Sequence, residues 1–165
     1  MEFKIEEKPA FYLVGVTQLL SIQEQGDDYA MQVLAESITE NQKEEMYELT
    51  NLYPMQEIHA KYTFTDSQMK KTDKQTHMIG VPTTKKNPFD DLEQVVIPNH
   101  TWAIFPSEGP YPDALQATRE KIYSEWRLSA HYEMVSDLEL SFTEFDEGLE
   151  DYYSEIWVAV REKQV

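Results

Sequence analysis

The stretch Tyr152-Tyr-Ser-Glu-Ile-Trp-Val-Ala-Val160, near the C-terminal end of the 165-residue sequence, decides the fold prediction. Its residues alternate as in a β-strand that has two different faces. One face carries Ser154, Ile156, Val158 and Val160. This stripe is mostly β-branched and aliphatic, and it suits a covering helix. The stretch therefore predicts a strand of a sheet that has a helix packed on one side.

The opposite face of this predicted strand places one carboxylate between two aromatic rings. It carries Tyr153, Glu155, Trp157 and Ala159. An unpaired carboxylate is costly in an apolar core, and a water-facing strand rarely needs a Tyr and a Trp around its single charge. A ligand pocket with Glu155 at its base and Tyr153 and Trp157 in its walls satisfies both observations. A structural hydrogen bond or ion pair of Glu155 is the alternative.

The charge balance limits the partners that the protein can have. Thirty-one acidic and 14 basic residues give a formal net charge of −17. Independent nucleic-acid binding needs a basic face, so the sequence argues against it. An acidic protein is compatible with small cationic molecules or with a basic protein partner. Solubility alone is the other explanation of the charge.

Several classes of protein find no support in the sequence. It has no apolar run of about 18 residues, so we expect no membrane span. It has no cysteine and no apolar segment of signal-peptide type at its start, so we expect a cytoplasmic protein without disulfides. We expect no metal and no cofactor, because no glycine-rich phosphate loop occurs and the histidines show no metal-ligand spacing; these are His59, His77, His100 and His131.

The order of predicted elements repeats once along the chain. Each half reads as strand, helix, strand, strand. In the first half we expect these elements at 11–16, 27–40, 55–65 and 77–81, with a further helical turn or two at 42–49. In the second half we expect them at 92–105, from 112 onward, at 138–145 and at 152–160.

This order predicts an α+β fold of two fused modules with antiparallel sheets. We expect module one at about residues 1–82, a linker at about 83–91 and module two at about 92–165. Two such sheets would form a concave face, and interfaces between modules are usual places for a pocket. Further candidates for the wall of this pocket, for which plain core packing is the alternative, are Tyr62, Trp102, Phe105 and Phe142.

Several short motifs, taken in order, resemble the GyrI-like effector-binding domains. These domains sense small molecules in multidrug-responsive transcription activators, and they also occur as stand-alone and integron-associated proteins. The motifs in the second half are Pro98-Asn-His-Thr-Trp-Ala-Ile-Phe105, Ser107-Glu-Gly-Pro110, Ile122-Tyr-Ser-Glu-Trp126 and Glu155-Ile-Trp-Val-Ala-Val160. In the first half, Phe11–Val16 and Met78-Ile-Gly-Val81 are similar to two of the family's strands.

The resemblance implies a pseudo-two-fold pair of modules with a ligand pocket between them. It also implies that Glu155 forms the floor of this pocket and attracts lipophilic cations stacked on aromatic rings. The chain departs from the family pattern at three places. Ala159 stands where Pro is common, Asn99 or His100 where Gly is frequent, and Thr143 where a second Glu is usual.

Three functions follow from these observations. The first is binding of lipophilic, cationic small molecules, with a role in transcription regulation that needs no DNA-binding segment of its own. The second is implied by the resemblance, because some GyrI-like proteins hydrolyse reactive cyclopropane-bearing compounds. Glu155 would then be the general base, assisted by Tyr153, since a carboxylate removed from water is a better base. The third is an acidic module that docks a basic protein.

Overall fold

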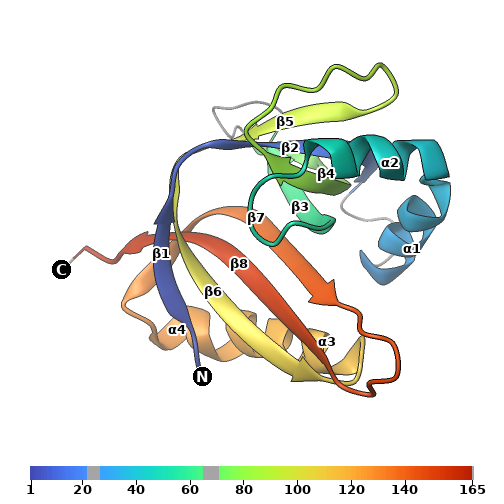
Figure 1. Cartoon of the computed structure of the whole chain (residues 1–165). Helices are drawn as coiled ribbons and strands as arrows, with labels where there is room; N and C mark the ends of the chain where they lie inside the picture. Colours follow the sequence, from blue (N-terminus) through green and yellow to red (C-terminus); the bar gives the residue numbers. More distant parts are fainter. Residues whose placement is uncertain (22–26, 65–70, 165) are drawn as a thin grey trace. The chain divides into compact units, whose positions relative to one another are not determined.

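The computed structural model describes residues 1–21, 27–64 and 71–164 (Figure 1). The chain divides into two compact units. We call Met1–Lys8 together with His100–Val165 the terminal unit, and Pro9–Asn99 the central unit. Within the described residues, no helix is both long and apolar enough to cross a membrane.

The terminal unit contains an antiparallel sheet with the strand order β1-β6-β8-β7. Its strands are β1 (Lys4–Lys8), β6 (His100–Gly109), β7 (Tyr132–Glu144) and β8 (Tyr152–Glu162). Strand β8, which contains residues 152–160, lies between β6 and β7. The alternation predicted for this stretch is confirmed, because its aliphatic stripe is buried under a helix.

The covering helical segment lies across one face of this sheet (Figure 1). It runs through α3 (Asp113–Lys121), the π-helical turn η1 (Ile122–Trp126) and α4 (Arg127–Ser129). The buried core between helix and sheet contains Leu115, Ile122, Trp126, Ala103, Phe105, Ile156, Val158 and Val160. We call this side of the sheet the helix face. The opposite side, which carries Trp102, Tyr153, Glu155 and Trp157, we call the carboxylate face.

The central unit contains four antiparallel strands in the order β3-β4-β2-β5. Its elements are β2 (Phe11–Ser21), α1 (Asp27–Ser37), α2 (Glu40–Leu49), β3 (Ile58–Phe64), β4 (Lys71–Thr83) and β5 (Glu93–Ile97). Helix α2 packs on this sheet through Met46 and Leu49, which meet Val14 and Val81 in a buried cluster.

Two glycines let the central strands of this unit approach closely. Gly15 on β2 lies directly opposite Gly80 on β4. A Cβ atom at Gly15 would lie 2.0 Å from the carbonyl oxygen of Ile79, and one at Gly80 would lie 2.7 Å from that of Val14. A side chain at either position would therefore push the two strands apart.

The helical part of the central unit breaks at Thr39, near the expected end of the first helix. The Thr39 hydroxyl accepts a hydrogen bond of 3.1 Å from the backbone N–H of Gln42, and the Gln42 side chain accepts one of 3.0 Å from the backbone N–H of Thr39. This reciprocal capping box begins a new helix at Glu40. The helical turns expected at 42–49 are thus a helix of their own.

The predicted α+β class is confirmed in both units, but the units do not follow the expected boundaries. Residues 4–8, which were placed in module one without a predicted strand, form β1 and pair with β6 of the terminal unit. The single strand predicted at 92–105 is two strands: β5 pairs with β2 of the central unit, and β6 pairs with β8 of the terminal unit. Local patterns show where a strand forms, whereas the partner of an edge strand depends on hydrogen bonds to residues far away in the sequence.

Candidate functional site

Both oxygens of the Glu155 carboxylate accept hydrogen bonds from the two aromatic residues beside it. The Tyr153 hydroxyl donates to Oε2 at 2.5 Å, and the Trp157 indole Nε1 donates to Oε1 at 2.9 Å. The carboxylate is well removed from water, because only 2% of the residue is exposed. The two aromatic donors satisfy the buried oxygens, but they are neutral and supply no countercharge themselves.

The strand geometry explains why one short sequence builds this arrangement. Residues two positions apart on a strand point to the same face, about 6.6–6.8 Å apart along the chain. Tyr153 and Trp157 therefore stand on either side of Glu155, and both side chains are long enough to reach back to it. The pattern Tyr-x-Glu-x-Trp thus brings its two donors to the acceptor within a single strand.

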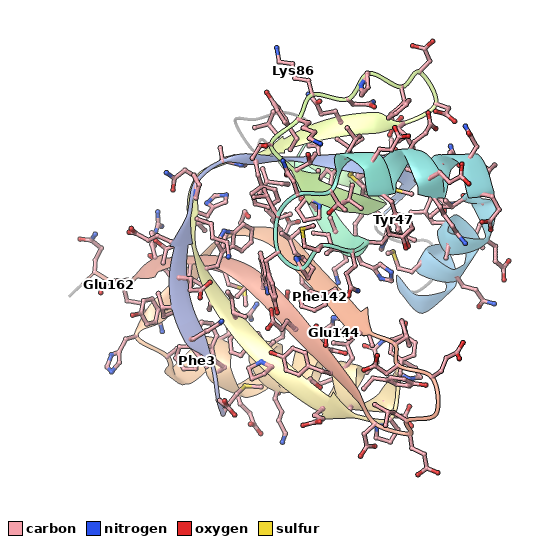
Figure 2. The ribbon with its side chains drawn as sticks, viewed as in Figure 1. Phe3, Tyr47, Lys86, Phe142, Glu144 and Glu162 are labelled. Carbon is pink, nitrogen blue, oxygen red and sulfur yellow. The ribbon has the colours of Figure 1, made fainter. Side chains whose placement is uncertain are left out.

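The neighbouring strands continue the carboxylate face with apolar residues. Phe142 of β7 (labelled in Figure 2) and Pro106 of β6 lie directly opposite Glu155 in the strand register. Leu140 and Ile104 hold the same positions relative to Trp157. Directly opposed residues share a face of the sheet. Glu155 therefore lies within an apolar and aromatic surface formed by three strands.

Trp102 extends the aromatic part of this surface toward the edge strand. Its ring centroid lies 5.9 Å from that of Trp157, with the ring planes tilted by 59°. The imidazole of His100 meets Trp102 edge-on at 5.4 Å. Trp102 is fully buried, and its indole Nε1 has no hydrogen-bond partner in the part of the chain that the structure describes. Its contribution to this face is therefore that of an apolar ring.

The edge strand β1 brings a cation to the same face. The Lys8 ammonium lies over the ring of Trp157, with its Nζ atom 4.8 Å from the ring centroid. This distance is within the range of a cation–π interaction. Sequence analysis missed Lys8, because a short charged segment near the N-terminus gave no sign that it pairs with β6.

Of the other predicted wall residues, one lies on the helix face and one belongs to the central unit. Phe105 belongs to the helix face, where its ring packs edge-on against Trp126 at 4.9 Å. It is three residues from Trp102, and positions an odd number apart on a strand point to opposite faces. Tyr62 is buried on β3 of the central unit, where desolvation and the charge of Glu93 raise its pKa to about 12. The structure therefore brings Tyr153, Glu155, Trp157, Trp102 and Phe142 to one face, without Phe105.

Thr143, which stands where a second Glu is usual in the family, also belongs to the helix face. The hydroxyl of Thr143 lies 2.8 Å from that of Ser154, its direct neighbour on β8. Phe145, two residues further on, is exposed and packs edge-on against Tyr111 and Tyr152.

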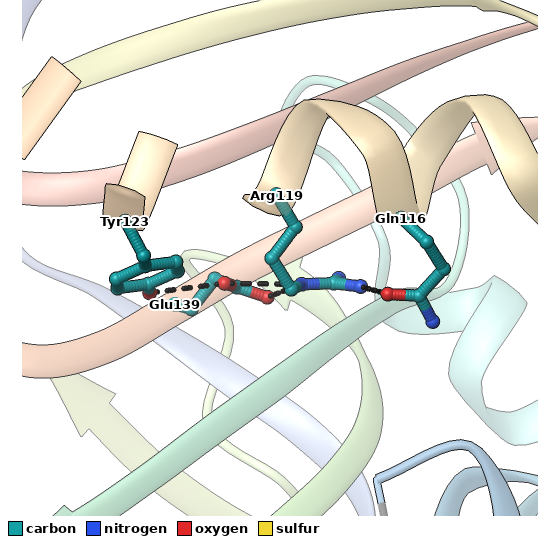
Figure 3. A network of polar contacts seen from close by, with 4 residues as sticks. All are labelled: Gln116, Arg119, Tyr123 and Glu139. Atoms are coloured by element: carbon teal, nitrogen blue, oxygen red, sulfur yellow. Dashed lines mark hydrogen bonds and ion pairs between the residues drawn. The ribbon is translucent and has the colours of Figure 1, made fainter. Parts of the chain in front are cut away.

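A second buried carboxylate, which sequence analysis missed, lies on the helix face (Figure 3). The Arg119 Nε donates to both oxygens of Glu139, at 3.0 and 3.3 Å, and the Tyr123 hydroxyl donates to Oε1 at 3.1 Å. The Arg119 Nη1 also donates to Gln116 at 2.7 Å. Burial, together with the charge of Glu139, raises the pKa of Tyr123. These contacts join helix α3 and turn η1 to strand β7, so we assign this network to structure.

The described residues contain no group of three His, Asp or Glu side chains that could hold a metal ion. The candidate site therefore consists of the carboxylate of Glu155, its two aromatic donors and the apolar surface around them.

The sequence profile of the GyrI-like small molecule binding domain matches residues 1–161. The chain belongs to this family. No curated protein matches the chain.

Solved structures of similar fold include two that match nearly the whole GyrI-like chain. One is SAV2435 bound to tetraphenylphosphonium, with a TM-score of 0.78 and 16% identity over 98% of this chain and 94% of that one. The other is a putative bacterial transcription regulation protein from Staphylococcus aureus MU50, with a TM-score of 0.75 and 17% identity over 98% of this chain and 99% of that one.

A third structure of similar fold is the EcmrR C-terminal domain. It has a TM-score of 0.65 and 14% identity, and the match covers 98% of each chain. At these identities the three structures establish the shared fold. The family match establishes that this chain is a GyrI-like small-molecule binding domain.

Proposed function

We propose that this GyrI-like domain binds lipophilic cations on the carboxylate face of its terminal unit. The observation that carries the proposal is the buried carboxylate of Glu155, held between the aromatic donors Tyr153 and Trp157. In this proposal Glu155 supplies the negative charge. Trp157 and Tyr153 supply ring contacts, and Trp102 and Phe142 supply apolar surface.

The burial of Glu155 favours a cationic ligand over a neutral one. Two opposite charges about 4 Å apart attract each other by about 4 kcal/mol at an effective dielectric constant near 20, compared with about 1 kcal/mol in water. A ligand whose charge is spread under phenyl groups loses little hydration when it leaves water. Such a ligand gains most of this attraction as net affinity.

The aromatic rings add affinity and little chemical selectivity. A cation over a Trp or Tyr ring gains about 0.5–2 kcal/mol, depending on how well water is excluded. Burial of apolar ligand surface adds about 25 cal/mol per Å2. These contributions favour any ligand that has a positive charge and a flat hydrophobic surface. The proposed specificity is therefore for lipophilic cations as a class.

Solved structures of other proteins with this fold also support the proposal. SAV2435 has been solved with tetraphenylphosphonium, a lipophilic cation of the expected kind. The fold is also that of the EcmrR C-terminal domain and of a protein described as a putative transcription regulator. We therefore extend the proposal to a sensing role in transcription regulation.

A calorimetric titration with tetraphenylphosphonium tests the proposal. Triphenylphosphine oxide, a neutral molecule with similar rings, serves as the comparison ligand. We expect the wild-type protein to bind the cation and Glu155→Gln to bind it about 10- to 100-fold more weakly, because roughly 1.4–2.8 kcal/mol of charge attraction is lost. The neutral compound should bind wild type and Glu155→Gln equally.

Glu162→Gln is the matched control for this titration. Glu162 lies on the same strand as Glu155 and is exposed at its end (labelled in Figure 2). Its substitution changes the net charge by the same one unit, so it reports the effect of the overall field alone. The proposal fails if no cation binds the wild-type protein, or if both Glu→Gln variants lose the same affinity.

A further inference from the structure

We propose that Lys8 is an internal substitute for the ligand's cation. In the ligand-free protein its ammonium lies over the ring of Trp157. A lipophilic cation displaces the ammonium from this position on binding. This inference rests on the proposed function, because it names the residue that a cationic ligand competes with at the same ring.

The contact of Lys8 with Trp157 carries the inference. The two residues come from different strands, β1 and β8, with β6 between them. The Lys8 side chain therefore reaches across one strand to place Nζ 4.8 Å from the centroid of the ring. The same indole donates its N–H to Glu155 at 2.9 Å. Trp157 thus connects the buried carboxylate at its edge to a cation over its ring.

Lys8 is held loosely enough to be displaced. A quarter of its side chain is exposed, whereas Trp157 is only 4% exposed. Its ammonium is paired with Glu6 at 3.2 Å, and both side chains of this pair are partly exposed to water. Ion pairs that are accessible to water contribute little stability. When a cationic ligand approaches the ring of Trp157, the Lys8 ammonium can therefore move into water at low cost in free energy.

Glu6 provides a position to which the displaced lysine can remain attached. It accepts two lysines, Lys8 at 3.2 Å and Lys4 at 3.3 Å. Burial alone would raise the pKa of Glu6, but the hydrogen bonds and charges of Lys8 and Lys4 lower it overall. Lys8 can leave the ring and stay close to Glu6, so displacement does not require β1 to detach from β6.

Lys4 offers an unusually close control for Lys8. Both lysines lie on β1 at positions of the same parity, and both pair with Glu6. The structure gives a ring contact with Trp157 for Lys8. Lys4→Met and Lys8→Met remove the same charge from the same strand, and methionine retains most of the aliphatic stem. A difference between the variants therefore reports the ring contact.

The test is a titration of wild type, Lys8→Met and Lys4→Met with tetraphenylphosphonium. We expect Lys8→Met to bind about two- to fivefold more tightly than Lys4→Met, equivalent to about 0.4–1 kcal/mol, because no internal cation has to be displaced. We also expect the indole N–H resonance of Trp157 in the ligand-free protein to shift in Lys8→Met and to stay in place in Lys4→Met. Equal affinities in the two variants, or weaker binding by Lys8→Met, would overturn the inference.

The outcomes separate this inference from the proposed function. If Glu155→Gln binds the cation as wild type does while Lys8→Met binds it more tightly than Lys4→Met, the role of Glu155 fails and that of Lys8 stands. If Glu155→Gln weakens binding and the two lysine variants are alike, the proposed function stands and the role of Lys8 fails. If Lys8→Met binds the cation and the other proteins do not, the result supports the displacement of Lys8 by the ligand. Absence of binding to every one of these proteins overturns both.

Discussion

The indole Nε1 of Trp157 donates a hydrogen bond of 2.9 Å to Oε1 of Glu155, two positions earlier on the same strand. This contact fixes the orientation of the ring relative to the carboxylate. Since both groups belong to β8, whose neighbours are β6 and β7, their geometry is set by the sheet. A cationic ligand would therefore meet a charge and a ring that are already positioned, which reduces the ordering cost of binding.

The hydrogen bond from Tyr153 to Glu155 should contribute measurably to stability. Hydrogen bonds to charged groups contribute about 1.5–3 kcal/mol, so we expect Tyr153→Phe to lower the free energy of unfolding by that amount. Urea denaturation followed by circular dichroism measures it. Tyr47→Phe, at an exposed position on α2 (labelled in Figure 2), should change stability by less than about 0.5 kcal/mol. Equal effects of the two substitutions would contradict the assignment.

The buried pair of Arg119 and Glu139 should behave differently from an exposed pair. Breaking a buried ion pair typically costs about 3–5 kcal/mol. Because a fifth of the Arg119 side chain is exposed, we expect Arg119→Met to cost about 2–3 kcal/mol. Arg161→Met, which removes the exposed arginine that pairs with Glu133, should cost at most about 1 kcal/mol. Urea denaturation of the two variants and of the wild-type protein measures both costs.

A double substitution tests the origin of this cost. If Arg119→Met is destabilising because it leaves a buried charge on Glu139, then Arg119→Met with Glu139→Leu should be more stable than Arg119→Met alone. A double variant that is less stable than either single variant would show that packing of the two side chains matters more than their charges.

His100 should make the protein less stable in mild acid. Burial lowers the pKa of His100 below its ordinary value of 6.5, so the unfolded chain takes up a proton more readily than the folded chain. The histidine therefore favours unfolding increasingly as the pH falls below about 6.5. We expect the melting temperature of wild type to fall more than that of His100→Gln between pH 7 and pH 5. The other histidines are present in both proteins, so parallel curves would refute the effect.

The alternation of β8 is the part of the candidate site that sequence predicted. It separated the aliphatic stripe of Ile156 and Val158 from the face of Glu155, because side-chain direction along one strand needs no knowledge of its partners. Trp102 and Phe105 could not be assigned in the same way. Their relation to Glu155 depends on the register that pairs Trp102 with Ala159 and Phe105 with Ile156. Only backbone pairing fixes that register.

The charged residues that sequence missed depend entirely on contacts distant in the chain. Lys8 meets Trp157 because β1 joins β6, and its own short, charged segment gives no strand signal. Arg119 and Glu139 are 20 positions apart and meet because α3 packs against β6 and β8, and β7 lies next to β8 in the sheet. The predicted linker at 83–91 failed as a boundary for the same reason, since the strand that follows it returns to β2.

The most direct test of the account uses the indole N–H resonances of its three tryptophans. Trp157 and Trp102 lie on the carboxylate face, whereas Trp126 lies in the core of the helix face and serves as an internal control. On addition of tetraphenylphosphonium, we predict that the resonances of Trp157 and Trp102 shift, that of Trp126 stays in place, and Glu155→Gln needs about 10- to 100-fold more ligand for the same shift. A Trp157 resonance that does not move, or one that moves equally in Glu155→Gln, would contradict the central claim.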